Sequence, residues 1–139
     1  MNTGKLFKAF VAITALVSLC LAVYSIVSLK TITNNMSVQN IAALQVECPE
    51  GTPISSWNWG TFNEVGQVKQ TTFTLRNVGN TQLNCNVTIE NLPDGWTISL
   101  SRSDWTIAPG ASTNLTISLR LDEALPVGDY SFSLNFYIP

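Results

Sequence analysis

Two patterns of apolar and polar residues divide the chain. An uninterrupted apolar run, AFVAITALVSLCLAVYSIVSL, covers residues 9–29 and contains no charged residue. From about residue 46 onward, apolar and polar residues alternate instead with a period of two. A long uncharged run is typical of a helix that enters a membrane, and strict alternation is typical of β-strands with one buried face. The sequence therefore predicts an N-terminal helix followed by a β-domain.

The apolar run has the length of a membrane-spanning helix. At about 1.5 Å per residue it is about 31 Å long, close to the roughly 30 Å hydrocarbon core of a bilayer. Lys5 and Lys8 precede the run and only Lys30 follows it, so the positive-inside bias places the N-terminus in the cytoplasm and the rest of the chain outside. We predict that residues 1–30 form a cytoplasmic tip and a transmembrane signal anchor that contacts membrane lipid. A cleaved secretory signal and a prepilin-type leader processed near Ala9 are the alternatives.

The remaining chain predicts a linker and one all-β domain. Residues 31–45 carry scattered apolar residues, and we expect a stalk or linker there, with the β-domain at residues 46–139. Pro, Gly and Asn gather between the alternating runs, where they favour turns. The expected strands are residues 44–48, 57–62, 72–76, 83–90, 96–101, 105–107, 114–121 and 130–138. Seven or eight short strands predict an immunoglobulin-like antiparallel β-sandwich.

Four turn motifs carry a family resemblance. They are Asn-Val-Gly-Asn at Asn77–Asn80, Leu-Pro-Asp-Gly-Trp at Leu92–Trp96, Ala-Pro-Gly at Ala108–Gly110 and Pro-Val-Gly-Asp-Tyr at Pro126–Tyr130. With these motifs, the segment from Gly66 to Phe136 resembles the prokaryotic Ig-like accessory domains, namely the cell-adhesion-related domain of bacteria and archaea and the NPCBM-associated domain of alpha-galactosidases. The resemblance implies a non-catalytic module of a surface or secreted protein, and we therefore expect neither enzyme activity nor a cofactor.

Charge and composition exclude several classes of function. The chain has 7 Lys and Arg against 9 Asp and Glu, and three of the cations precede residue 31. Nucleic-acid binding needs clustered Lys and Arg, so no nucleic-acid partner is expected. The sequence has no His, which excludes Ser-His-Asp and Cys-His catalysis and His-ligated zinc. Asp122, Glu123 and Asp129 match no calcium-loop spacing, and no metal site is predicted.

Two tryptophans in a Trp57-Asn58-Trp59-Gly60 segment are candidates for a ligand-facing aromatic pair. Their spacing places both indoles on one face of a strand, where exposed rings can stack on a sugar. The alternative is a first core strand, because buried aromatics contribute a large apolar area. We favour the core interpretation.

The exported part contains two cysteines, Cys48 and Cys85. In an oxidising compartment, an even pair predicts a disulfide, and Cys85 lies on the inward positions of its strand. Two buried thiols, or an intermolecular bond through Cys48, are the alternatives.

Asn35, Asn86 and Asn114 each begin an Asn-x-Ser/Thr sequon and are glycosylation candidates. Asn86 and Asn114 fall on outward positions of their predicted strands, where a glycan could be accommodated.

Taken together, these patterns predict a membrane-anchored cell-surface protein with a non-catalytic Ig-like structural or adhesion module. Its expected partner is a cell-surface protein or a glycan. The alternatives are a pilin-like filament subunit, with its apolar helix in the fibre core, and a carbohydrate-binding accessory module.

Overall fold

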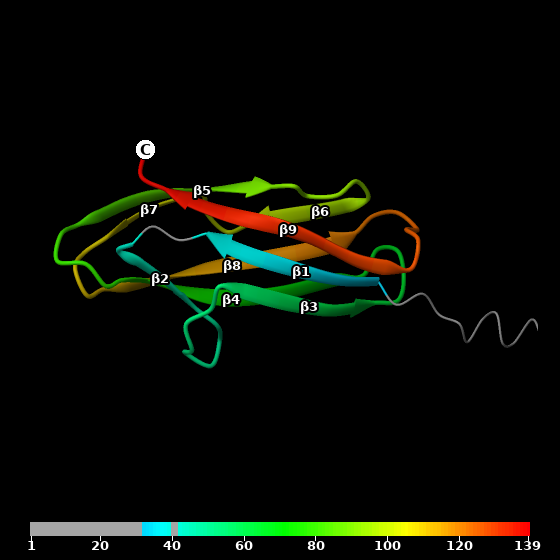
Figure 1. Cartoon of the computed structure of the whole chain (residues 1–139), viewed down its shortest axis with the longest axis horizontal. Coiled ribbons are helices and arrows are strands. Elements are labelled where there is room, and N and C mark those ends of the chain that lie inside the picture. The colour runs from blue at the N-terminus through cyan, green and yellow to red at the C-terminus, as the bar shows by residue number, and fades with distance from the viewer. Residues whose placement is uncertain (1–31, 40–41) are drawn as a thin grey trace, which may run out of the picture. The chain divides into compact units, whose positions relative to one another are not determined.

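The computed structural model describes residues 32–39 and 42–139, and these residues form a β-sandwich (Figure 1). The predicted all-β architecture is therefore confirmed. The described part contains nine strands, whereas the sequence predicted seven or eight. They are β1 (Ile32–Gln39), β2 (Leu44–Glu47), β3 (Ser56–Phe62), β4 (Val68–Asn77), β5 (Leu83–Glu90), β6 (Trp96–Leu100), β7 (Asp104–Ile107), β8 (Ser112–Leu121) and β9 (Gly128–Tyr137).

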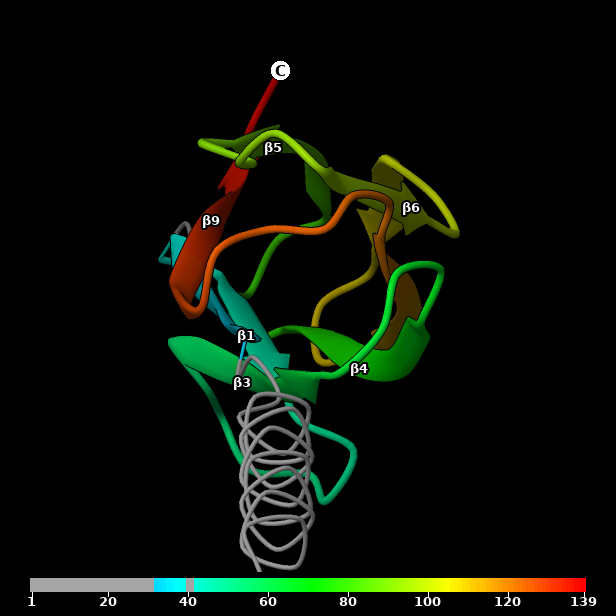
Figure 2. The same cartoon turned by 90° about the vertical axis from the view of Figure 1, so that its right-hand side faces the viewer.

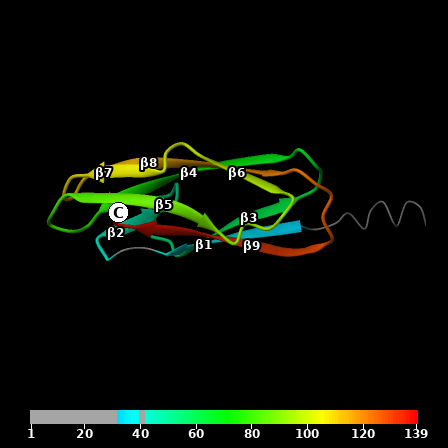
Figure 3. The same ribbon diagram turned by 90° about the horizontal axis from the view of Figure 1, so that it is seen from above.

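The strands form two sheets. One has five strands in the order β3-β1-β9-β5-β7, and the other has four in the order β2-β4-β8-β6. Figure 2 looks along the strands, with β1, β3 and β9 on one side of the sandwich and β4 and β6 on the other. Figure 3 shows the same two layers from above. Neighbouring strands are antiparallel except β1 and β9, which pair in parallel from Ile32↔Gly128 to Gln39↔Asn135.

The alternating apolar residues meet between the two sheets and form a single core. Phe73 on β4 is fully buried and packs in T-shaped contacts with two indole rings, with ring centroids 5.4 Å from Trp57 and 6.4 Å from Trp59. Phe62 on β3 makes a similar contact with Trp96 on β6, at 4.8 Å. Such aromatic side chains bury a large apolar area, and burial of apolar area favours folding.

The segment predicted as a stalk is part of the sandwich, so the linker prediction is wrong. Residues 32–39 form β1 in the interior of the five-stranded sheet, and Leu44 and Gln45 begin β2 in the other sheet. Met36 is 0% exposed, as a core residue is and a stalk residue would not be. The compact unit that contains the sandwich begins at Thr31.

A β-bulge shapes the edge strand β3. The register with β1 shifts between Asn34 and Asn35, which makes Trp59 the extra residue, and Gly60 adopts a positive φ of 71°. The Lys69 ammonium on β4 donates to the Trp59 carbonyl at 2.8 Å. Lys69 thus connects the two sheets, and its partial burial lowers its pKa.

The loops gather at two ends of the sandwich. Ile32, where β1 begins, pairs with Gly128 and Phe62, so it lies at the end that carries the β3–β4 and β8–β9 loops. The β5–β6 loop reaches the same end, where Gly95 accepts a hydrogen bond from the Asp122 amide. At the β8–β9 corner, the Tyr130 hydroxyl donates to the Pro126 carbonyl at 2.9 Å, a bond characteristic of immunoglobulin-like sandwiches.

The predicted helix at residues 1–30 lies outside the described residues. Within the described ranges, no helix is long and apolar enough to cross a membrane.

Candidate binding surface on the four-stranded sheet

The outer face of the four-stranded sheet carries a polar groove of about 300 Å³. Its lining comes from three neighbouring strands: Val68 on β4, Thr97 and Ser99 on β6, and Ser118 and Arg120 on β8. Register explains the grouping, since Arg120 pairs with Val68 on one side and with Thr97 on the other. Ser118 lies directly beside Ser99 in the next row.

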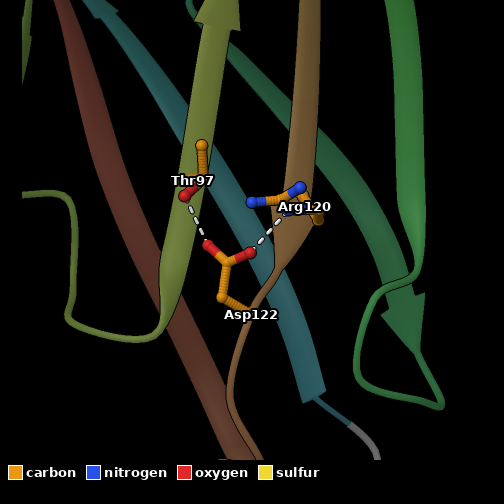
Figure 4. A network of polar contacts seen from close by, with 3 residues as sticks. All are labelled: Thr97, Arg120 and Asp122. Carbon is orange, nitrogen blue, oxygen red and sulfur yellow. Dashed lines mark hydrogen bonds and ion pairs between the residues drawn. The ribbon is translucent and has the colours of Figure 1, made fainter.

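Two of the lining residues, Thr97 and Arg120, belong to a polar network with Asp122 (Figure 4). The Asp122 carboxylate accepts a hydrogen bond from the Thr97 hydroxyl and another from Arg120 Nε at 2.5 Å. The hydrogen bond from Thr97, supported by Arg120, holds the pKa of Asp122 below its ordinary value. Arg120 is thereby oriented, and a guanidinium has further N–H groups with which to bind a ligand.

Hydroxyl groups extend the polar surface along the strands. Ser118 donates to Gln70 Oε1 at 3.0 Å, and the Thr72 and Thr116 hydroxyls lie 2.9 Å apart. Such a face can exchange hydrogen bonds with a hydroxylated or anionic ligand. Chemically it offers binding groups, because Ser and Thr need an adjacent base to act as nucleophiles.

The groove residues were not singled out from the sequence. Alternation did place Thr97, Ser99, Ser118 and Arg120 on outward positions. Alternation does not show which strands are neighbours, and it is the pairing of β6 with β8 that brings these residues together.

The tryptophan pair does not form a ligand-facing platform. Trp59 is 4% exposed and Trp57 is half-buried, and both pack on Phe73. A sugar can stack only on an exposed ring face. The buried position of Trp59 therefore excludes stacking of a sugar on both rings. The ligand-facing alternative is wrong for Trp59.

The predicted disulfide is not formed in the structure. Cys48 and Cys85 are both buried and free, and burial raises the pKa of the Cys85 thiol. Cys48 follows β2 in the four-stranded sheet, whereas Cys85 lies in β5 of the other sheet, opposite Trp105. Alternation predicts correctly that Cys85 points inward. It does not predict which of the other inward residues Cys85 contacts.

The sequon residues lie on three different strands. Asn114 on β8 is exposed, and Asn86 on β5 and Asn35 on β1 are half-buried. Asn114 therefore offers the most accessible amide of the three, and glycosylation at all three stays a prediction.

The acids Asp122, Glu123 and Asp129 do not come together as a ligand set. Asp122 is engaged by Thr97 and Arg120, and in the part of the chain that the structure describes no three side chains are grouped to hold a metal ion.

The β-unit is an Ig-like domain. It has two facing sheets of short, mostly antiparallel strands, and the Tyr130 hydroxyl donates a hydrogen bond to the Pro126 carbonyl at the β8–β9 corner. The chain belongs to the HYDIN/CFA65/VesB-like Ig-like domain family, whose family model matches residues 57–137. No curated protein matches it. An Ig-like domain of this kind is typically non-catalytic and suggests a structural module. The matched segment begins in β3, and β1 and β2 precede it.

Proposed function

We propose that the protein is a membrane-anchored cell-surface protein whose Ig-like sandwich is an exported structural and adhesion module. The apolar run at residues 9–29 supports the anchor, and Lys5 and Lys8 before it support an N-terminus in the cytoplasm. The observation that carries the proposal is the membership of an Ig-like family in a chain that also contains a membrane-length apolar run.

The composition of the sandwich surface supports exposure to the outside. Its outer faces are rich in Ser, Thr and Asn, and the described unit carries few charges for its size. The finer resemblance to cell-adhesion-related and NPCBM-associated domains is part of this proposal.

Protease treatment of intact cells tests the topology. We expect cleavage of the exposed sandwich after mild heating and retention of a membrane-bound fragment that contains residues 9–29. Full protection of the sandwich in intact cells, with cleavage only after lysis, would contradict export. Mass measurement of the mature N-terminus separates the anchor from its rivals: a start at Ala9 would support the pilin-like filament subunit.

The polar groove supports carbohydrate binding as a second candidate function. Arg120 is fixed by Asp122 beside three hydroxyl-bearing residues, Thr97, Ser99 and Ser118. An array of neutral and uronic-acid glycans is the direct probe. Binding that is lost in Arg120→Gln and kept in Arg76→Gln, a cation on β4 outside the groove, would support it. Equal binding by both variants would place the glycan elsewhere.

A further inference from the structure

The strand β6 has an unoccupied edge. It is the last strand of the four-stranded sheet, and its backbone pairs with β8 alone among the described strands (Figure 2). Its sequence, Trp-Thr-Ile-Ser-Leu, contains no charge and no proline, two features that usually prevent an edge strand from pairing with another chain.

The direction of the free backbone groups follows from the observed hydrogen bonds. The Asp122 amide donates to Gly95, and the Ser101 amide donates to Thr116. Because hydrogen-bonded pairs alternate along an antiparallel ladder, Thr97 and Ser99 also turn their backbone groups toward β8. The N–H and C=O groups of Trp96, Ile98 and Leu100 therefore point to the free edge.

The other margins of the two sheets are protected. The edge strand β3 has the bulge at Trp59 and the Lys69 ammonium bound to it. At the margin of β2, Ile54 donates to Val46, so the following loop covers this strand. The strand β7 has only four residues and is flanked by the Arg102–Asp104 ion pair.

Inward side chains are incompletely covered along the same edge. Ile98 and Leu100 are half-buried, whereas the inward residues of β8 that they adjoin, Ile117 and Leu119, are fully buried. One further strand beside β6 would remove this apolar surface from water.

We infer that β6 pairs with β6 of a second copy, antiparallel and about a two-fold axis at Ile98. In this register Trp96 lies opposite Leu100 of the other copy, and Ile98 lies opposite itself. All the edge-directed N–H and C=O groups of the strand then bond in pairs, and the apolar side chains of both copies meet on the inner face.

Charge complementarity favours a second copy as the occupant of this edge. The same register brings the turn before β6, which contains Asp94, next to the segment after β6 of the other copy, which contains Arg102, and the converse. Asp94 is exposed, and the Arg102 side chain is 60% exposed and held only by Asp104 at 3.6 Å. When two copies of β6 pair in antiparallel orientation, Asp94 of each copy lies near Arg102 of the other, and the charges attract. Parallel pairing would instead bring the two Asp94 residues together and the two Arg102 residues together.

The symmetry has a consequence for adhesion, which rests on the proposed membrane anchor. Ile32 lies at the end of the sandwich from which β6 starts, since Gly95 and Asp122 are bonded there. Antiparallel pairing of β6 therefore sends the two Ile32 residues to opposite ends of the joined sheets. Copies anchored through their N-termini would then pair across two facing membranes.

Charge reversal at the two ends of β6 tests the pairing. In full-length protein in detergent, we expect Asp94→Arg and Arg102→Asp each to weaken self-association about tenfold, because both ion pairs become like-charge contacts. Mixing the two variants restores attraction at both ends, so native mass spectrometry should detect the mixed dimer in preference to either homodimer. Association through the N-terminal segment would leave both variants unchanged, and that result would overturn the proposal.

A backbone measurement provides an independent readout. The Ile98 and Leu100 amides should gain protection from hydrogen exchange as protein concentration rises, while the Thr97 and Ser99 amides, bonded to β8, stay protected at all concentrations. Ile98→Pro should abolish the concentration dependence, since it removes a free N–H group and no internal bond. Thr106→Pro on β7 is the matched control, because its amide also points to a free edge. Exchange of Ile98 and Leu100 that is independent of concentration would also overturn the pairing.

Vesicles separate this inference from the proposed function. Lipid vesicles that carry the full chain should cluster, and vesicles that carry only Asp94→Arg should cluster with those that carry Arg102→Asp. Dimers in detergent without clustering of vesicles would sustain the pairing of β6 and contradict adhesion between membranes.

Discussion

Asn77 is a fully buried polar side chain at the end of β4. Its amide nitrogen donates to the carbonyls of Thr81 and Ile107 at 2.8 and 2.9 Å, and its amide oxygen accepts from the Gly79 amide at 2.9 Å. The residue thus fixes the β4–β5 turn and joins it to the end of β7. The Asn-x-Gly-Asn motif predicted a turn here, but the bond to Ile107 depends on tertiary packing.

We expect Asn77→Ala to lower the free energy of unfolding by about 2–3 kcal/mol, because it removes three hydrogen bonds to backbone groups, of which the bond to the Ile107 carbonyl is buried and the other two are partly buried. Thermal or urea unfolding measures the loss. Asn80→Ala in the same turn is the control, since Asn80 is exposed and should change stability by about 0.5 kcal/mol or less. Equal effects of the two substitutions would contradict the role of Asn77.

Asp122 makes the stability of the sandwich depend on pH. Its pKa in the folded protein lies below the ordinary value of 3.8, because the folded state hydrogen-bonds the charged carboxylate through Thr97 and Arg120. The unfolded chain therefore takes up the proton first, and the contribution of Asp122 is present above about pH 3.8 and is lost as pH falls through the folded pKa.

The corresponding prediction compares melting temperatures of wild type and Asp122→Asn. Wild type should melt higher at neutral pH, and the difference should close below pH 3.8. A difference that persists unchanged into acid would show that the carboxylate charge is not the source of the stabilisation.

Single residues also mark the limit of what the sequence could predict. Alternation assigned Trp59, Trp96, Trp105 and Cys85 to the inner face, and all four are buried. It could not assign their partners, because an inward residue can meet any other inward residue of either sheet. The disulfide between Cys48 and Cys85 was predicted without knowing which residues each cysteine contacts, and both thiols are free.

At the scale of the element, β1 is the strand that the sequence pattern concealed. Its inward residues are Ile32, Asn34, Met36 and Val38, and all four are buried. Asn34 interrupts the apolar series, so the alternation in Ile-Thr-Asn-Asn-Met-Ser-Val-Gln is incomplete. Both side-chain polar atoms of Asn34 are buried without a hydrogen-bond partner in the described part of the chain, which makes this strand unusual.

We expect Met36→Ala to cost about 2–5 kcal/mol of unfolding free energy, the range for a large core side chain. Met36 is 0% exposed and belongs to the hydrophobic core, and its strand lies between β3 and β9. Ser37→Ala, on the outer face of the same strand, is the control and should have little effect. Chemical denaturation of both variants decides whether β1 belongs to the core or only lies along it.

For the whole molecule, the position of β1 sets the boundary of the folding unit. The strand β3 is joined to its sheet only through β1, so removal of β1 detaches two strands from β9. We expect the fragment 46–139 to remain unfolded and the fragment 31–139 to unfold cooperatively. Circular dichroism during heating measures both, and a cooperative transition in the shorter fragment would restore the linker interpretation.

The general architecture was accessible from sequence because it depends on local signals. Period-two alternation and turns rich in Gly, Pro and Asn specify short strands, and their number indicates a two-sheet sandwich. Sheet order and register are set by contacts between distant residues, such as Arg120 with Val68 and Thr97. The groove on the four-stranded sheet and the free edge of β6 depend on that order, so both came from the structure alone.

The parallel pairing of β1 with β9 determines how the domain responds to mechanical force. β1 begins at one end of the sandwich, and β9 finishes toward the other, with eight residue pairs between them in register. A pull between the start of β1 and the end of β9 runs along both strands, so their hydrogen bonds are loaded together in shear rather than opened one after another. A protein tethered at its N-terminus and held at its far end would therefore resist extension until the whole ladder yields at once.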